Sequence, residues 1–299
     1  MRVGITGASG LLGTALAPAL EARGHEVWRL VRGSGPPRAE RAIAWDPAEG
    51  RIDAAAVARL DAIVHLAGEN LAAGRWSEAR KHSILASRVD GTSLVARTIA
   101  SLDRKPVLLS ASGAGYYGDS GDAPLDETAP RGSGFLADVC GAWESATEPA
   151  AHAGARVVVL RMGVVLSATG GALAKMLLPF KLGLGGRIGS GRQWMSWVTI
   201  EDMVRVVCFA LERESLAGAI NVVAPSPIRS VDFTSTLARV LSRPSVLPLP
   251  AFAVRAAFGE MGEQVLLGGQ RVLPARLERE GFRFEHPELE PALRYVLAR

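Results

Sequence analysis

A glycine-rich turn close to the N-terminus constrains this chain more than any other feature. Residues 6–13 read TGASGLLG and directly follow the apolar residues 3–5. Gly7 permits a sharp turn off a strand, Gly10 lets the backbone approach phosphates, and Gly13 lets the next helix pack closely on a sheet. Free N–H groups at that helix start attract negative charge. The order of strand, turn and helix predicts a dinucleotide site, and the alternative is a plain strand-to-helix turn.

The second apolar run, residues 25–32, indicates which dinucleotide is bound. An NAD site normally offers an acidic side chain to the adenosine ribose at the end of this strand. Arg32 stands there instead, where a guanidinium can pair with a 2′-phosphate. We therefore expect NADP as the cofactor. The alternative is that Arg32 is a solvated loop residue.

Composition limits the other classes of function. The 299 residues are 48% hydrophobic and 21% charged, which is typical of one large or two interlocked folded domains. The formal charge of +4 comes from scattered arginines, so we expect no nucleic-acid partner. No apolar run reaches the roughly 18 residues of a spanning helix, so we expect no membrane partner. The first predicted strand begins at residue 2, which leaves no room for a signal sequence and favours a cytoplasmic protein.

Neither cysteine nor histidine spacing predicts a metal site. Cys140 and Cys208 lie far apart, without a Cys-x-x-Cys pattern. The five histidines, at 25, 65, 82, 152 and 286, show no i, i+4 spacing with each other. We expect no metal, and we expect both cysteines to be buried helix residues in a reducing compartment.

Apolar runs alternate with segments of helical period. Strands are predicted at 2–6, 26–31, 61–66, 106–111, 156–163 and 219–223, with a further short one at 42–46, and helices at 14–23 and 87–101. This alternation predicts an α/β fold, a doubly wound parallel Rossmann sheet, with a smaller α+β C-terminal lobe. We expect residues 1–165 and 201–223 to form the NADP-binding domain. Residues 166–200 and 224–299, rich in glycine and then proline, are expected to form the substrate lobe over the strand ends.

Several motifs in order resemble a known superfamily. The glycine turn, HLAG at 65–68 and SASGAGYYG at 110–118 resemble the extended short-chain dehydrogenase/reductase superfamily. GENL at 68–71, GRW at 74–76, SRV at 87–89, LPF at 178–180, GLGG at 183–186 and GEM at 259–261, running on to Pro274, are similar to its atypical "epimerase family" group. That resemblance implies an NADP-binding fold and a C-terminal domain of unassigned function.

The chain departs from that superfamily at its catalytic residues. The superfamily uses a Ser or Thr with a Tyr and a Lys that lie four residues apart on one helix. Aligning Trp143 and Glu144 with the acidic end of that helix puts Leu136 at the tyrosine position and Cys140 at the lysine position. A leucine cannot transfer a proton, and a thiol cannot supply the ammonium charge. The superfamily's usual mechanism, in which the Tyr and Lys pair transfers a proton, therefore cannot operate with these residues.

Two hydroxyl groups are the candidates to replace that set. Ser112 lies just past the fourth long strand, one residue before Gly113, which falls at the superfamily's hydroxyl position. Tyr116 follows on the same loop. We expect Ser112 and Tyr116 to orient and protonate a carbonyl that receives hydride. The alternative is a phosphate- or ribose-binding loop with a packed aromatic ring.

The expected cofactor contacts follow the turn, the strand ends and one helix. Arg88 is expected to reach a cofactor phosphate or ribose from the helix after the HLAG turn, with help from Lys81; the alternative is an exposed helix arginine. The full expected set is Gly7, Ser9, Gly10, Leu11, Leu12, Gly13, Val31, Arg32, Leu66, Ala67, Gly68, Arg88, Ser110, Ala111, Gly163 and Val165.

Three further features carry weaker expectations. Glu69 and Asn70 place a carboxylate and an amide at the cleft mouth, unless they are simply solvated loop residues. Trp194 and Trp197 are core residues or a pocket wall. Asp202 is expected to cap a helix over 203–212.

These observations predict an NADP-dependent oxidoreductase acting on a small, partly apolar carbonyl or alcohol. The runner-up enzyme is a sugar-nucleotide epimerase or dehydratase, which the superfamily favours and the missing tyrosine weakens. The competing class is an NADP-binding regulator without turnover. The oligomeric state is left open by the sequence.

Overall fold

An eight-stranded sheet forms the centre of the computed structural model, which describes residues 1–33 and 39–298. The strand order is β12-β8-β6-β5-β1-β2-β3-β4, and only β4 runs antiparallel to its neighbour. This order is that of a doubly wound Rossmann sheet and confirms the predicted fold class. The strands are β1 (Arg2–Thr6), β2 (Glu26–Arg32), β3 (Ala42–Asp46), β4 (Arg51–Ile52), β5 (Ala62–His65), β6 (Val107–Gly113), β8 (Val157–Met162) and β12 (Gly218–Val222).

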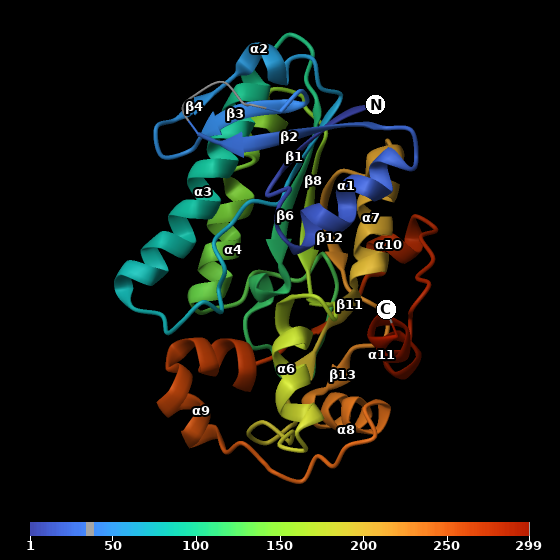
Figure 1. Ribbon diagram of the computed structural model, residues 1–299. Coiled ribbons are helices and arrows are strands. Elements are labelled where there is room, and N and C mark those ends of the chain that lie inside the picture. Colours follow the sequence, from blue (N-terminus) through green and yellow to red (C-terminus); the bar gives the residue numbers. More distant parts are fainter. Residues whose placement is uncertain (34–38, 299) are drawn as a thin grey trace.

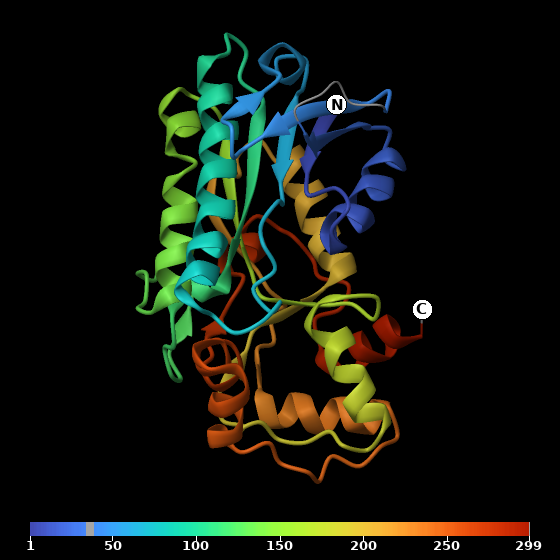
Figure 2. The ribbon, with the colours of Figure 1, turned by 60° about the vertical axis from the view of Figure 1, so that its left-hand side comes forward.

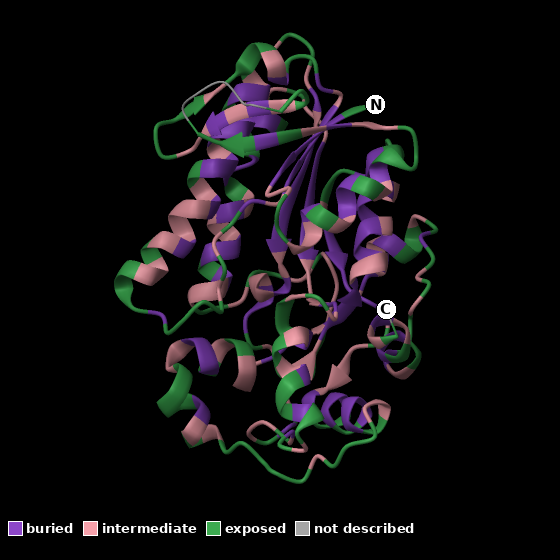
Figure 3. Ribbon diagram, in the orientation of Figure 1, coloured by how far each residue is buried: buried purple, intermediate pink, exposed green. Residues whose placement is uncertain are grey.

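Helices cover both faces of this sheet (Figures 1 and 2). On one face, α1 (Leu11–Glu21) and α7 (Ile200–Glu212) share a core with β1, β5 and β8. On the other face lie α3 (Glu78–Ser101), α4 (Phe135–Ser145) and α5 (Glu148–His152), with the short α2 (Ala54–Val57) near one edge. Figure 3 shows the central strands buried along their length. Their near-continuous apolar runs follow from burial on both faces.

A smaller lobe lies beyond the carboxyl ends of the strands, in the lower half of Figure 1. Its core is built on Leu173, Phe233 and Leu293. Its helices are α6 (Gly171–Lys181), α8 (Ser230–Val240), α9 (Ala251–Phe258), the π-helical turn η2 (Gly262–Leu267) and α11 (Leu289–Leu297). Its strand pairs are β9 (Val164–Leu166) with β11 (Trp197–Thr199), β10 (Trp194–Met195) with β13 (Ile228–Arg229), and β14 (Arg271–Val272) with β7 (Pro124–Leu125).

The division into two lobes at the predicted boundaries stays a proposal. The segment after β14 bears on it, because α10 (Ala275–Arg279) lies against β12 rather than within the smaller lobe. Leu277 and Phe282 belong to the same core cluster as the large sheet. Residues 275–282 therefore pack on the Rossmann core, although they fall within the range predicted for the substrate lobe.

Helix starts were predicted less well than strands. The helix α3 begins at Glu78, nine residues before the predicted start, because Ser77 caps it by accepting a hydrogen bond from the N–H of Arg80 at 3.2 Å. The prediction that Asp202 caps a helix over 203–212 was wrong. That helix, α7, begins at Ile200, and its cap is Thr199, whose Oγ1 accepts from the Asp202 N–H at 3.1 Å.

The glycine turn brings two backbone segments into direct contact. Gly7 has a φ of +66°, and a Cβ there would lie 3.0 Å from the backbone nitrogen of Ala67. The Oγ1 of Thr6 accepts from the N–H groups of Leu66 at 3.0 Å and Ala67 at 3.1 Å. The end of β1 is thereby tied to the loop that follows β5.

His65 lies at the buried end of β5 beside this junction. Its Nδ1 is 2.8 Å from the Thr6 Oγ1, and its ring meets Trp45 edge-on at 5.8 Å. Its Nε2 is buried and has no hydrogen-bond partner within residues 1–33 and 39–298. Burial, with the positive charge of Arg32 adding to it, lowers the pKa of His65 to about 4. The imidazole is therefore neutral in the folded protein at neutral pH.

Gly13→Ala should destabilise the protein by about 1–3 kcal/mol through overpacking. The added Cβ would lie 2.4 Å from the Gly7 carbonyl oxygen and 2.5 Å from the Ala8 Cα, so the helix or the turn must move. Gly91→Ala in α3 is the matched control, because its Cβ would lie no closer than 3.4 Å to His65 and Trp45. We expect it to stay within about 1 kcal/mol of the parent. Urea unfolding of the three proteins measures both effects, and equal stabilities would refute the close-packing argument.

Stability should fall as the pH drops from about 6.5 to 4, because of His65. The unfolded chain protonates this group near pH 6.5, whereas the folded chain does so only near pH 4. The unfolded state therefore binds more protons than the folded state in this window. The stability that the neutral imidazole contributes, on the order of 3 kcal/mol, is fully present above the window and is lost below it. His65→Gln should flatten this slope in urea unfolding at pH 7, 6 and 5. The exposed His152 provides the control, since His152→Gln should leave the slope unchanged; a slope that persists in His65→Gln would exclude His65 as its source.

Candidate cofactor and catalytic site

The start of α1 faces the carboxyl edge of the sheet next to the point where the strand order reverses. Such a reversal, here between β1 and β5, opens a crevice in which ligands of open α/β sheets bind. The N-cap residue of α1 is Gly10, and no side chain caps this helix. The amide N–H groups of the first turn therefore point at the crevice without a competing side-chain acceptor. This arrangement, with glycine where a Cβ would crowd the turn, fits a bound pyrophosphate.

The expected cofactor residues lie in the glycine turn, at the start of α1, at the end of β2, in the loop after β5, in α3, in β6 and around β9. Leu11 lies against the start of α6, since a Cβ on Gly171 would be 3.3 Å from its Cδ2 and 3.5 Å from the Val165 oxygen. Gly163 lies where a Cβ would be 2.5 Å from the Ser196 oxygen. Ser9 and Gly68 are exposed, Leu12 is half-buried, and Ser110 and Ala111 are buried within β6.

Arg32 and Val31 end β2 as exposed residues. The Arg32 guanidinium makes no ion pair with any side chain of residues 1–33 and 39–298. Its positive charge contributes to lowering the pKa of His65 and of Glu69. A free cation at the end of the second strand is what a 2′-phosphate requires.

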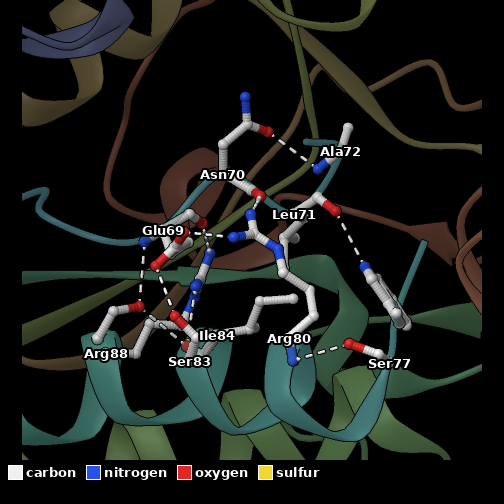
Figure 4. A network of polar contacts seen from close by, with 11 residues as sticks. Glu69, Asn70, Leu71, Ala72, Ser77, Arg80, Ser83, Ile84 and Arg88 are labelled. Carbon is white, nitrogen blue, oxygen red and sulfur yellow. Dashed lines mark hydrogen bonds and ion pairs between the residues drawn. The ribbon is translucent and has the colours of Figure 1, made fainter. Parts of the chain in front are cut away.

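Glu69 anchors the loop after β5 to helix α3, as Figure 4 shows. Its carboxylate accepts from the Ser83 hydroxyl at 2.8 Å and is ion-paired with Arg80. The hydrogen bond from Ser83, followed by that from Arg80, lowers the pKa of Glu69. Asn70 carries the only side-chain amide of this loop, and Figure 4 shows this amide directed away from α3. Glu69 is therefore a paired loop anchor, and Asn70 is the group presented outward.

Arg88 is buried beneath the same loop, with 7% of its surface exposed. Its guanidinium donates to the Glu69 carbonyl oxygen at 3.0 Å and lies 4.9 Å from the Trp143 ring. A Cβ on Gly68 would be 3.5 Å from its Cζ. Burial lowers the pKa of Arg88. The structure thus makes Arg88 a support of the Gly68 turn, and its contact with the cofactor stays a prediction.

Ser112 takes part in a buried ionic cluster. It is 2% exposed, and its hydroxyl donates to the Glu144 Oε1 at 2.7 Å. Glu144 also accepts from the Arg161 Nε at 2.9 Å and Nη2 at 2.8 Å. Burial opposes the charged form of Arg161, but Glu144 outweighs it and raises the pKa of the guanidinium. Ser112 therefore points at α4 and is not hydrogen-bonded to Tyr116.

Two tyrosines complete this cluster from the turn η1 (Ala114–Tyr117). The Tyr116 ring lies over the Arg161 guanidinium at 3.5 Å. The Tyr117 hydroxyl donates to the Asn221 Oδ1 at 2.7 Å and accepts from the Arg161 Nη1 at 3.0 Å. Burial raises the pKa of Tyr117. The Tyr116 hydroxyl has no hydrogen bond to any group of residues 1–33 and 39–298.

Sequence reasoning assigned no role to Arg161, and it missed Asn221 altogether. Arg161 interrupts an apolar run and Asn221 stands inside a buried strand. A polar group in such a run needs a partner, because an unpaired buried charge or amide is costly. That signal marks both residues as part of a polar cluster, although it does not name Glu144 or Tyr117 as the partners.

Leu136 and Cys140 lie beside the loop in which the superfamily keeps its hydroxyl. A Cβ on Gly115 would be 3.2 Å from the Leu136 Cβ, and a Cβ on Gly113 would be 3.6 Å from the Cys140 Sγ. Burial, and then the charge of Glu144, raises the pKa of Cys140 to about 11. This thiol stays protonated and neutral at physiological pH, so neither position supplies the positive charge of a lysine.

No helix in residues 1–33 and 39–298 is long and apolar enough to cross a membrane. In the same part of the chain, no group of three His, Cys, Asp or Glu side chains is placed to hold a metal ion.

Comparison with known proteins gives matches over the whole chain. The model of the NAD dependent epimerase/dehydratase family matches residues 3–223, and a domain of unknown function, DUF1731, matches residues 249–296. An epimerase family protein of Mycobacterium bovis is 46% identical over 99% of this chain and 98% of its own length. The epimerase family protein SDR39U1 of Homo sapiens is 39% identical over the full length of both chains.

Solved structures agree with these matches. The human SDR39U1 structure, determined with NADPH, has a TM-score of 0.89 and 38% identity, with both chains covered completely. A nucleoside-diphosphate sugar epimerase from Corynebacterium glutamicum has a TM-score of 0.81 and 35% identity over 99% of this chain and 58% of that one. The chain belongs to the NAD dependent epimerase/dehydratase family and carries a C-terminal DUF1731 unit.

Proposed function

We propose that this protein is an NADP(H)-dependent oxidoreductase that acts on a small carbonyl compound or the corresponding alcohol. The observation that carries the proposal is the uncapped start of α1 behind the Gly7 turn, together with the Arg32 guanidinium at the end of β2, which makes no ion pair within the described residues 1–33 and 39–298. The human relative solved with NADPH supports the choice of cofactor. A 2′-phosphate would be held by Arg32, and a pyrophosphate by the N–H groups at residues 11–13.

The bound cofactor would supply or accept the hydride, and the chain supplies orientation and hydrogen bonds. The loop after β5 is held rigidly by Glu69 and Arg88, so the backbone at Gly68 forms a fixed wall of the cofactor site. The residues in this proposal are those expected from the sequence: Gly7, Ser9, Gly10, Leu11, Leu12, Gly13, Val31, Arg32, Leu66, Ala67, Gly68, Arg88, Ser110, Ala111, Gly163 and Val165.

Of the two proposed proton-handling residues, Tyr116 is the better placed. Its hydroxyl has no competing hydrogen bond within the described residues, and the guanidinium of Arg161 lies against its ring. The hydroxyl of Ser112 is already committed to Glu144. Ser112 can therefore act on a carbonyl only through the ionic cluster, whereas Tyr116 can donate directly to a developing oxyanion.

Two other functions have support from particular observations. A sugar-nucleotide epimerase or dehydratase is favoured by the family and by the Corynebacterium relative, and is opposed by Leu136 at the tyrosine position. An NADP-binding regulator without turnover is favoured by the loss of both Tyr and Lys. A regulator would bind NADPH but would not oxidise it, whichever carbonyl compound is offered.

Arg32→Ala should weaken NADPH binding by roughly 10- to 100-fold and leave NADH binding unchanged, because it removes only a charge-assisted hydrogen bond to the 2′-phosphate. Isothermal titration with both nucleotides gives the two dissociation constants. Arg29→Ala is the matched control, since Arg29 is also exposed on β2 but lies in mid-strand, three residues earlier. An unchanged NADPH preference in Arg32→Ala would remove Arg32 from the site.

Turnover should depend more on Tyr116 than on Ser112. NADPH oxidation with a panel of small carbonyl compounds would show substrate-dependent turnover, which Tyr116→Phe should lower by about 100-fold or more at unchanged NADPH affinity. Tyr295→Phe, in α11 of the smaller lobe, serves as the matched control and should retain activity. Binding of NADPH without oxidation across the panel would instead favour the regulator.

A further inference from the structure

A cavity of about 170 Å³ lies between two parts of the chain that are far apart in sequence. One wall comes from the Rossmann part, with Gly115 after β6 and Leu136 at the start of α4. The other wall comes from the DUF1731 unit, with Gln264 and Leu267 of η2 and Gln270 just beyond it. The C-terminal unit therefore closes a space that the Rossmann part leaves open.

The wall from the C-terminal unit is held in place by a chain of polar contacts. The Gln264 Oε1 accepts from the N–H of Leu136 at 3.0 Å, and its Nε2 donates to the Glu260 Oε1 at 2.9 Å. Glu260 is in turn ion-paired with Lys81 of α3 at 2.5 Å. Gln264 lies on a π-helical turn, a rare element that is frequent at functional sites. The cavity is thus a built feature of the contact between the two parts.

This cavity adjoins the position where the superfamily keeps its tyrosine. Gly115 and Leu136 line it, and they lie so close together that a Cβ added to Gly115 would be 3.2 Å from the Leu136 Cβ. Tyr116 follows Gly115 directly. A molecule in the cavity would therefore lie within a residue or two of the hydroxyl to which the proposed function assigns proton transfer.

The lining selects against anions. Its ionisable groups are two carboxylates, Asp119 and Glu263, and no Lys, Arg or His of the described residues lines it. Glu263 is ion-paired with Arg255, whereas Asp119 and the Gln270 side chain have no hydrogen bond within residues 1–33 and 39–298. Free carboxylate and amide groups accept hydrogen bonds from ligand hydroxyls. A phosphate or carboxylate would instead meet like charge.

The volume limits the size of the ligand. At about 170 Å³, the cavity is smaller than the roughly 300–1,000 Å³ that is typical of pockets for drug-sized ligands, which favours a small compound. A nucleoside diphosphate sugar does not fit within it.

We propose that this cavity binds a small neutral polyhydroxy carbonyl compound or its alcohol, and that the DUF1731 unit serves to complete this subsite. The proposal rests on the proposed function, whose substrate class it names. Asp119 accepts hydrogen bonds from the ligand hydroxyls, the Gln270 amide accepts from or donates to them, and Gln264 fixes the wall through its contact with Leu136 of α4.

The test is methyl NMR on the full-length protein, with and without saturating NADPH. The probe is dihydroxyacetone, and pyruvate and UDP-glucose are compared with it at equal concentration. Dihydroxyacetone should shift the methyl signals of Leu136, Ala137 and Leu267, which line the cavity, and the other two compounds should not. Gln270→Leu, which removes the free amide at similar size, should weaken this binding roughly tenfold. Thermal melting of the variant checks that it is folded.

A matched pair of charge changes sharpens the result. Asp119→Asn should weaken dihydroxyacetone binding and relieve the exclusion of pyruvate, whereas Asp103→Asn, on the exposed turn after α3, should change neither. Stronger shifts with pyruvate or UDP-glucose than with dihydroxyacetone, or equal dihydroxyacetone affinity in folded Gln270→Leu, would overturn the proposal. NADPH binding without any dihydroxyacetone shift would also overturn it and leave the proposed function standing. Dihydroxyacetone shifts without NADPH binding would support the cavity proposal and overturn the proposed function.

Discussion

The contact of two backbone segments at the carboxyl edge of the sheet is the constraint on which the rest of the structure depends. Gly7 lies against the backbone of Leu66 and Ala67, and the Thr6 hydroxyl accepts from both of their N–H groups. Gly13 lets α1 sit directly on the turn. These contacts fix the first helix turn over the switch point of the sheet, which is the turn that we propose binds the pyrophosphate.

The buried pair of Glu144 and Arg161 organises the neighbouring half of the site. It joins α4 to β8 and takes up the hydroxyls of Ser112 and Tyr117. A pair of this kind is costly to desolvate and gives a single defined arrangement when all of its hydrogen bonds are made. Here the arrangement leaves the Tyr116 hydroxyl as the group without a partner in the described cluster. The site therefore differs from the Tyr and Lys set of the superfamily in its residues, with Leu136 and Cys140 at the aligned positions.

The sequence predicted what depends on local pattern. Apolar runs located the strands, and the spacing of Gly7, Gly10 and Gly13 located the turn, because each is a property of consecutive residues. The partners of polar side chains could not be predicted in the same way. Ser112 and Glu144 are 32 residues apart, and only the folded chain brings them together. The prediction that Asp202 caps α7 was wrong for a related reason. Both Thr199 and Asp202 are residue types that cap helices, and the sequence alone does not show at which of them the helix begins.

A crystal structure of this protein with NADPH tests the central claim most directly. The account predicts the pyrophosphate within hydrogen-bond distance of the N–H groups at the start of α1, and the 2′-phosphate against the Arg32 guanidinium. A nucleotide bound elsewhere, or a 2′-phosphate in solvent with Arg32 turned away from it, would contradict the account.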